Sequence, residues 1–171
     1  MNYKEKLNKV KTFVFDVDGV FTDGKVYLFK DELIRALNSK DGYAVQYASK
    51  LGYKIFVITG GDSQEVKKRL EGLGVEKVVL KSKNKEKVLD DLQKEYNLTL
   101  QEILYMGDDI PDLPVFPLVG VSTCPSDACI DVLKAVDYPS RFAGGKGCVR
   151  DVIEQTLRVQ DNWLKEQAYE W

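Results

Sequence analysis

The stretch Lys11–Gly24, KTFVFDVDGVFTDG, decides the fold that we expect for this chain. Thr12 to Val17 are β-branched or aromatic apart from Asp16, a composition typical of a buried parallel strand. Asp16 interrupts the apolar run, and Asp18 and Gly19 follow it. Open α/β sheets place their active sites at the carboxyl ends of buried strands, so the two carboxylates indicate a site there. An Asp-x-Asp-Gly sequence is also an ordinary strand-ending turn, and the rest of the chain must decide between the two interpretations.

Length and composition favour one domain, residues 1–171, in the cytoplasm. The 171 residues suffice for one core, and 44% hydrophobic residues is ordinary for a soluble protein. The net charge of −2 gives no electrostatic case for nucleic acid or for an anionic membrane. No apolar run approaches the roughly 18 residues of a membrane span, and the polar N-terminus has no apolar signal core.

Histidine and cysteine usage exclude several catalytic classes. The chain has no histidine, which excludes Ser-His and Cys-His catalysis and the usual zinc enzymes. Cys124, Cys129 and Cys148 have no metal-ligand spacing, and an odd, low number of cysteines suits reduced thiols. Acid–base chemistry would therefore fall to carboxylates or lysine.

Strand-like and helix-like segments alternate along the rest of the chain. We expect a β-hairpin over about residues 24–38, from two β-rich segments on either side of Lys30-Asp31-Glu32. The other expected strands are residues 53–58, 77–80, 103–106 and 118–121. The expected helices are residues 41–51 with Asp41 as N-cap, 63–74, 84–96, 126–133 and a long C-terminal helix over about 147–169. This alternation predicts an α/β fold, a Rossmann-like doubly wound parallel sheet with a projecting hairpin.

Three predicted strands end in polar residues. These ends are Asp16-Val17-Asp18, Thr59-Gly60-Gly61 and Gly107-Asp108-Asp109. In a doubly wound sheet they converge at one edge, and Lys85 adds an ammonium at the start of a helix. Carboxylates, a hydroxyl and an ammonium suit a phosphoryl group beside Mg²⁺, which prefers oxygen ligands.

The same segments resemble the four motifs of the haloacid dehalogenase (HAD) superfamily of phosphatases. The resemblance rests on DVDGVFTDG, ITGG, the lysine Lys85 in SKNKEKV, and GDDIPDLPV, which occur in that order over nearly the whole chain. A closer resemblance is to the 3-deoxy-D-manno-octulosonate 8-phosphate (KDO 8-phosphate) phosphatase family. That family has a similar TDG, a segment ending in Asp-Gly (here NSKDG), GDD-x-x-D, and a late AGG-x-G-x-VR segment, here residues 143–150.

The resemblance implies catalytic roles that the chemistry supports. Asp16 would be the nucleophile and form an aspartyl-phosphate. Asp18 would protonate the leaving alkoxide and then deprotonate the hydrolytic water. Thr59 would hold a phosphoryl oxygen, and Lys85 would neutralise charge on the nucleophile and the phosphoryl group. Lys85 lies among three other lysines and Thr59 could simply lead into a helix, so neither residue alone is specific.

The resemblance also implies a magnesium site at the same strand ends. Asp108 would bind Mg²⁺ with the carboxylate of Asp16 and the backbone carbonyl of Asp18. Asp109 and Asp112 would support that site, although both also suit helix caps. Magnesium would offset the phosphate charge and orient it for in-line attack.

The spacing of the motifs leaves no room for a cap domain. A hairpin, one helix and one strand fill the interval from Asp18 to Thr59, and one helix and one strand fill the interval to Lys85. The resembling family forms homotetramers, in which hairpins pair and a neighbouring subunit closes the site, so the resemblance implies a homotetramer here. The apolar side chains on the predicted hairpin fit such an assembly, because they would be a liability on a monomer; they are Val26, Leu28, Ile34 and Leu37.

The resemblance implies that the substrate is a sugar-acid phosphate, KDO 8-phosphate, from the synthesis of lipopolysaccharide precursors. Thr59, Gly60 and Gly61 would face its phosphate. Its carboxylate needs cations, and the candidates outside the core motifs are Lys40, Arg69, Lys146 and Arg150. Two alternatives stay open: a phosphatase for a nine-carbon ulosonate 9-phosphate, and a non-catalytic assembly domain with the same fold.

Overall fold

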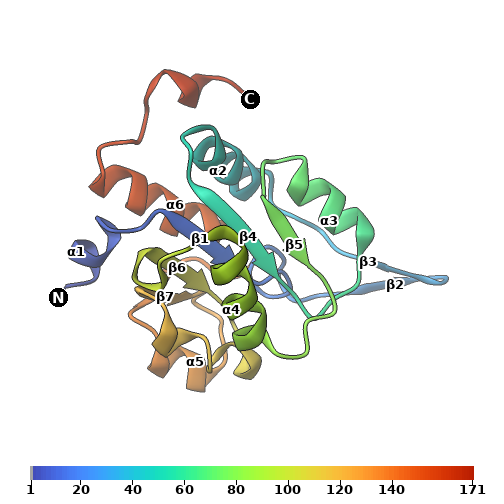
Figure 1. Ribbon diagram of the computed structural model, residues 1–171. Helices are drawn as coiled ribbons and strands as arrows, with labels where there is room; N and C mark the ends of the chain where they lie inside the picture. The colour runs from blue at the N-terminus through green and yellow to red at the C-terminus, as the bar shows by residue number, and fades with distance from the viewer. Residues whose placement is uncertain (1) are drawn as a thin grey trace.

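A parallel sheet forms the centre of the protein (Figure 1). The computed structural model describes residues 2–171. All neighbouring pairs of strands in the six-stranded sheet are parallel, in the order β5-β4-β1-β6-β7-β8. The strands are β1 (Thr12–Phe15), β4 (Lys54–Ile58), β5 (Lys77–Val79), β6 (Ile103–Met106), β7 (Val121–Cys124) and β8 (Tyr138–Pro139). This order places β1 between β4 and β6, so three polar strand ends are neighbours.

Helices cover both faces of the sheet. One face packs against α1 (Tyr3–Leu7), α2 (Ser39–Lys50), α3 (Gln64–Glu71) and α6 (Cys148–Val159), and the other against α4 (Lys85–Tyr96) and α5 (Ile130–Ala135). Side chains alternate along β1, so Phe13 and Phe15 join the first core while Val14 joins the second. Short 3-10 turns occur at Leu100–Glu102, Ile110–Asp112, Phe116–Leu118 and Glu166–Tyr169. The expected α/β fold, doubly wound and without a cap, is confirmed.

A two-stranded hairpin projects from this core (Figure 1). Its strands, β2 (Tyr27–Phe29) and β3 (Glu32–Ile34), are antiparallel and form a sheet of their own. The side chains of the hairpin are exposed although many are apolar, and Leu28 is 80% exposed. Within residues 2–171, none of the helices has the length and apolar character that crossing a bilayer requires.

The C-terminal helix is shorter than the sequence predicts. Apolar residues continue at helical spacing as far as Leu164, but α6 ends at Val159 and only a 3-10 turn follows at Glu166–Tyr169. Asp161 and Leu164 have positive φ angles of 54° and 63°, which a right-handed helix does not allow. The segment instead folds against α2, where Trp163 packs edge-to-face on Tyr47. The late apolar residues therefore serve tertiary packing and not a continuous helix.

Other differences have local causes. The N-cap of α2 is Asn38 and not Asp41, because the Asn38 side chain accepts the N–H of Lys40. Asp41 is instead fully buried and accepts the N–H of Arg150. The strand expected at residues 118–121 begins only at Val121, and the helix expected at 126–133 lies at 130–135. The short elements α1 and β8 were not predicted.

Candidate active site

The carboxyl ends of β1, β4 and β6 meet around one cavity of about 530 Å³. Asp16 follows β1, Thr59 follows β4, and Gly107 and Asp108 follow β6. Lys85 enters from the first residue of α4. The residues that line the cavity are Asp16, Asp18, Gly19, Gly24, Thr59, Gly60, Gly61, Ser82, Lys85, Asp108, Asp109, Pro111 and Asp112. The structure therefore brings together every residue that the sequence assigned to the catalytic, metal and phosphate sites.

Lys85 joins two buried carboxylates at the base of the cavity. Its Nζ donates to Asp16 Oδ2 at 2.6 Å and to Asp112 Oδ1 at 2.7 Å. Asn84 caps α4 through the N–H of Lys87, which fixes the start of the helix and with it the position of Lys85. Because the ammonium is buried together with its two partners, it is a fixed positive charge beside Asp16 and not part of a solvated lysine-rich surface.

Asp112 holds the loop that carries Asp108. Its Oδ1 accepts bonds from Lys85 and from the hydroxyl of Tyr105, and its Oδ2 accepts the backbone N–H groups of Asp108 and Asp109. Gly107 makes this approach possible, since a Cβ there would lie 2.1 Å from Asp112 Cγ. Both oxygens of Asp112 are thus already hydrogen-bonded. Asp109 is exposed, and its side chain caps the turn through the N–H of Ile110.

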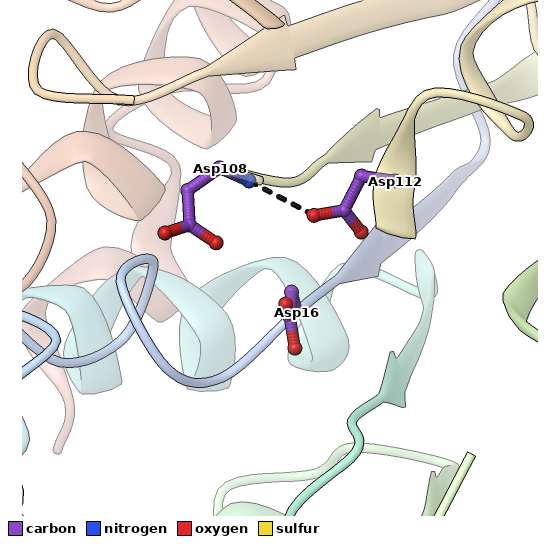
Figure 2. A group of neighbouring side chains, drawn as sticks. All are labelled: Asp16, Asp108 and Asp112. Carbon is purple, nitrogen blue, oxygen red and sulfur yellow. Dashed lines mark hydrogen bonds between the residues drawn. The ribbon is translucent and has the colours of Figure 1, made fainter. Parts of the chain in front are cut away.

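Three carboxylates are close enough to share one cation. One oxygen from each of Asp16, Asp108 and Asp112 lies within 4.8 Å of the others, and Figure 2 shows the three around one space. Gly19 leaves room for Asp108, because a Cβ on Gly19 would lie 1.9 Å from Asp108 Oδ2. An all-oxygen set of this kind fits Mg²⁺. Asp112 accepts two hydrogen bonds on each oxygen, and Asp16 accepts one on each, from the N–H of Val17 and from Lys85. Asp16 and Asp108 therefore have more capacity for direct coordination than Asp112.

The electrostatics of the cluster favour an added cation. Burial raises the pKa of Asp16 to about 6, against the opposing effect of Lys85, and the charge of Asp112 adds to the rise. Burial also raises the pKa of Asp108 to about 7, with contributions from Asp16 and Asp112. Burial alone would lower the pKa of Lys85, but its two carboxylate partners outweigh burial and raise it. Lys85 therefore stays charged, and the carboxylates still have negative charge that a divalent ion can offset.

The Thr59 loop and Asp18 also line the cavity. Thr59 is buried, and its hydroxyl accepts the N–H of Gly61 at 3.1 Å. The carboxylate of Asp18 is not part of the metal-binding cluster and instead pairs with Arg35. Arg35 was not predicted as a site residue. It directly follows β3, and only the path of the hairpin base shows that its side chain reaches Asp18.

The four cations expected to bind the substrate carboxylate do not line this cavity. Lys40, Lys146 and Arg150 line a separate groove of about 610 Å³, together with Arg141 and Arg158. Arg69 lines a third, smaller pocket beside α2. Within one chain, the cation beside Asp18 is therefore Arg35. That Lys40, Arg69, Lys146 and Arg150 bind the substrate carboxylate remains a prediction, in which a second subunit would bring them to the site.

Comparison with known proteins supports the sequence resemblance. A scan against models of protein families finds no match. Over 158 residues the chain is 34% identical to 3-deoxy-D-manno-octulosonate 8-phosphate phosphatase KdsC of Haemophilus influenzae, covering 92% of this chain and 88% of that protein.

Solved structures give the same result. One is the 3-deoxy-D-manno-octulosonate 8-phosphate phosphatase of Moraxella catarrhalis, crystallised with a magnesium ion, a phosphate ion and KDO. It matches this chain with a TM-score of 0.91 at 30% identity, over 94% of this chain and 93% of that one. A HAD superfamily (subfamily III A) hydrolase from Legionella pneumophila has a TM-score of 0.92 at 30% identity, covering 97% and 91%.

Fold, site and comparisons together define the class of protein. The chain belongs to the capless phosphatases of the HAD superfamily, subfamily IIIA. Within that class it is a phosphatase similar to KDO 8-phosphate phosphatase. The interpretation as a non-catalytic assembly domain is therefore set aside.

Proposed function

We propose that this phosphatase hydrolyses KDO 8-phosphate to KDO and phosphate, a step in the synthesis of lipopolysaccharide precursors. The observation that supports the proposal most is the contact of Lys85 with Asp16 beside Asp108, at the carboxyl edge of the sheet. A relative with the same fold was crystallised with magnesium, phosphate and KDO. The free, partly or fully buried cysteines of the described residues fit the reducing cytoplasm that we assign to the enzyme.

The proposed reaction has two steps on the chain's own residues. Asp16 attacks phosphorus as the bond to the sugar oxygen breaks, and Asp18 gives that oxygen its proton. Asp18 then takes a proton from a water molecule that attacks the aspartyl-phosphate, which releases phosphate and restores Asp16. Lys85 stays beside Asp16 and stabilises the charge of the transferring group, while the Thr59 hydroxyl and the amides of Gly60 and Gly61 hold phosphoryl oxygens.

The proposed metal ligands are Asp16, Asp108 and the backbone carbonyl of Asp18. Asp112 holds the Asp108 loop and Lys85, and Asp109 caps the turn between them. When bound, Mg²⁺ neutralises phosphate charge and orients the group for in-line attack.

We further propose that the enzyme acts as a homotetramer. The catalytic cavity has no cap over it, and the exposed apolar hairpin offers a surface for contact between copies. Contacts of this kind would bring another subunit's residues to an open site. Lys40, Arg69, Lys146 and Arg150 remain the proposed partners of the substrate carboxylate on that basis.

A side-by-side comparison of substrates tests the proposed function. We expect a higher kcat/KM for the eight-carbon KDO 8-phosphate than for a nine-carbon ulosonate 9-phosphate, because Gly61 adds neither bulk nor charge at the cavity wall. A preference of about tenfold or more for the nine-carbon acid, roughly 1.4 kcal/mol in transition-state binding, would reassign the enzyme to that substrate.

A further inference from the structure

Asp18 has one hydrogen-bonding partner, and it comes from the hairpin. Arg35 Nε donates to Asp18 Oδ1 at 2.6 Å, and Nη2 donates to Oδ2 at 3.2 Å. Among the hydrogen bonds of residues 2–171, no other group donates to this carboxylate. The two bonds form the planar fork that arginine makes with carboxylates, so they fix the direction of the carboxylate as well as its place.

The side chain of the arginine is more buried than that of the aspartate. The side chain of Arg35 is 9% exposed and that of Asp18 is 36% exposed. Arg35 lines a small pocket at the base of the hairpin, together with Val17, Thr59, Gly61, Ser63, Val66 and Leu80. The guanidinium is therefore the more enclosed member of the pair, and Asp18 is the member that lines the catalytic cavity.

Gly61 lies at the point where Arg35, Asp18 and Thr59 come together. A Cβ at position 61 would lie 3.5 Å from Arg35 Nη2, 3.6 Å from Asp18 Oδ2 and 3.4 Å from Thr59 Oγ1. A longer side chain there would have to extend from the point where the three groups meet. The guanidinium, Asp18 and the Thr59 hydroxyl therefore all lie within van der Waals reach of position 61.

We propose that Arg35 is the positioning residue for Asp18. The base of the hairpin thereby determines the orientation of the Asp18 carboxyl, which protonates the leaving oxygen. This inference rests on the proposed role of Asp18 as general acid and base. Arg35 directly follows β3, so the base of the hairpin determines where its side chain begins. A change in the hairpin would therefore reach the chemistry through one side chain, without displacing Asp16, Lys85 or Asp108.

The inference predicts a defect that depends on the leaving group. A sugar alkoxide is a poor leaving group and needs the proton from Asp18, whereas p-nitrophenolate leaves without protonation near neutral pH. Since kcat/KM reports the steps up to the first phosphoryl transfer, it isolates this difference from the later hydrolysis. A loss of folding or of phosphate binding would instead lower kcat/KM for both substrates alike.

The experiment measures kcat/KM for KDO 8-phosphate and for p-nitrophenyl phosphate, with Mg²⁺, in Arg35→Gln and Arg35→Lys. For Arg35→Gln we expect a loss of about 30-fold on the sugar phosphate and less than about threefold on the aryl phosphate. The first loss lies below the roughly 10²–10⁴-fold worth of a general acid, because Asp18 itself is still present. Arg35→Lys should recover part of the loss, because it keeps the charge without the fork. The matched control is Lys94→Gln, which removes an exposed cation paired with Asp90 on α4, outside the catalytic cavity and the basic groove.

Asp18→Asn, measured in parallel, separates the possible failures. Suppose that Asp18→Asn loses activity on the sugar phosphate only. Equal losses on both substrates in Arg35→Gln, or no loss, would then overturn the positioning role of Arg35 and leave the proposed function standing. A wild-type enzyme inert towards both esters, or an Asp18→Asn variant with equal losses on both, would overturn the proposed function. Thermal unfolding of each variant identifies any that fail to fold, in which case Arg35→Lys carries the test.

Discussion

Lys85 Nζ lies 2.6 Å from Asp16 Oδ2, a contact between residues 69 positions apart that joins the start of α4 to the end of β1. Both side chains are buried, so solvent screens the attraction between their charges less than in a surface ion pair. It keeps Lys85 protonated and one oxygen of Asp16 occupied. The carboxylate that we propose as nucleophile is therefore held in place before any substrate arrives.

Asp16→Asn should abolish turnover and leave the fold intact. The amide keeps the shape of the carboxylate, but it is a poor nucleophile and a weaker ligand for magnesium. Phosphate release by the variant is the measurement, with Asp90→Asn, an exposed aspartate paired with Lys94, as the control. Release at the wild-type rate from a clean preparation would contradict the role of Asp16.

Removal of the metal should abolish activity reversibly. The oxygens of Asp16 and Asp108 suit octahedral coordination by Mg²⁺, whereas Ca²⁺ accepts looser and higher coordination and would misplace the nucleophile. After treatment with EDTA, we expect added Mg²⁺ to restore phosphate release and added Ca²⁺ to fail. Full activity in excess EDTA would show that the acidic cluster works without a metal.

Charge on the hairpin should divide the assembly. Val26→Asp with Leu28→Asp places two carboxylates on the exposed apolar face, and we expect native mass measurements to show the tetramer replaced by smaller species. KM should rise, because the open cavity would lose the neighbouring subunit, while the unfolding temperature of the folded chain should change little. Ile130→Asp, at an exposed apolar residue of α5, is the matched control. A wild-type protein that is only monomeric at micromolar concentration would refute the assembly.

Asp41 should make stability depend on pH. Burial raises the pKa of Asp41 to about 6 from 3.8, while the N–H groups of Arg150 and Gly147 oppose the rise. Because the folded state holds this proton more tightly than the unfolded state, the free energy of unfolding falls as pH rises from about 4 to about 6. The whole effect is on the order of 3 kcal/mol.

Asp41→Asn should remove that fall. The amide oxygen can still accept the N–H of Arg150, and Oδ2, the atom replaced, has no hydrogen bond. Denaturant titrations across this pH range, on the variant and the wild type, measure the difference, which we expect to grow with pH and level off above about 6.5. A difference that stays constant with pH would mean that Asp41 is not titrating in that range. Asp31→Asn, at the exposed hairpin turn, is the control.

The sequence predicted the parts of the molecule whose causes are local. The apolar run of Ile103–Met106 gives a strand with the expected bounds, and polar residues at three strand ends meet because parallel strands share an edge. The resemblance to the HAD motifs singled out Lys85 among four lysines, and the structure places it in the cavity.

Other features depend on tertiary packing that no local pattern shows. Asp41 is of a residue type that often caps helices, but the packing of α2 against α6 buries it beside Arg150. Apolar residues after Val159 keep helical spacing and yet fold back onto Tyr47. Arg35 lies in a segment that reads as an exposed strand, and its contact with Asp18 exists only because the base of the hairpin turns towards the Thr59 loop.

Gly19→Ala should weaken the metal site, and Gly52→Ala is its matched control. Both glycines have positive φ, 81° and 90°, so both substitutions bear a similar backbone strain, about 1 kcal/mol or more. Only at Gly19 does the new methyl group meet another residue, at 1.9 Å from Asp108 Oδ2, whereas nothing lies within 4 Å at Gly52.

We therefore expect comparable losses of stability in the two variants but a loss of magnesium affinity in Gly19→Ala alone. Calorimetric titration with Mg²⁺ measures the affinity, and thermal unfolding in EDTA measures the stability without the metal. A tenfold or greater rise in Kd, about 1.4 kcal/mol, for Gly19→Ala against an unchanged Kd for Gly52→Ala would assign the effect to the displaced carboxylate. Equal Kd values in the two variants would show that Asp108 can move away from the methyl group and still bind the ion.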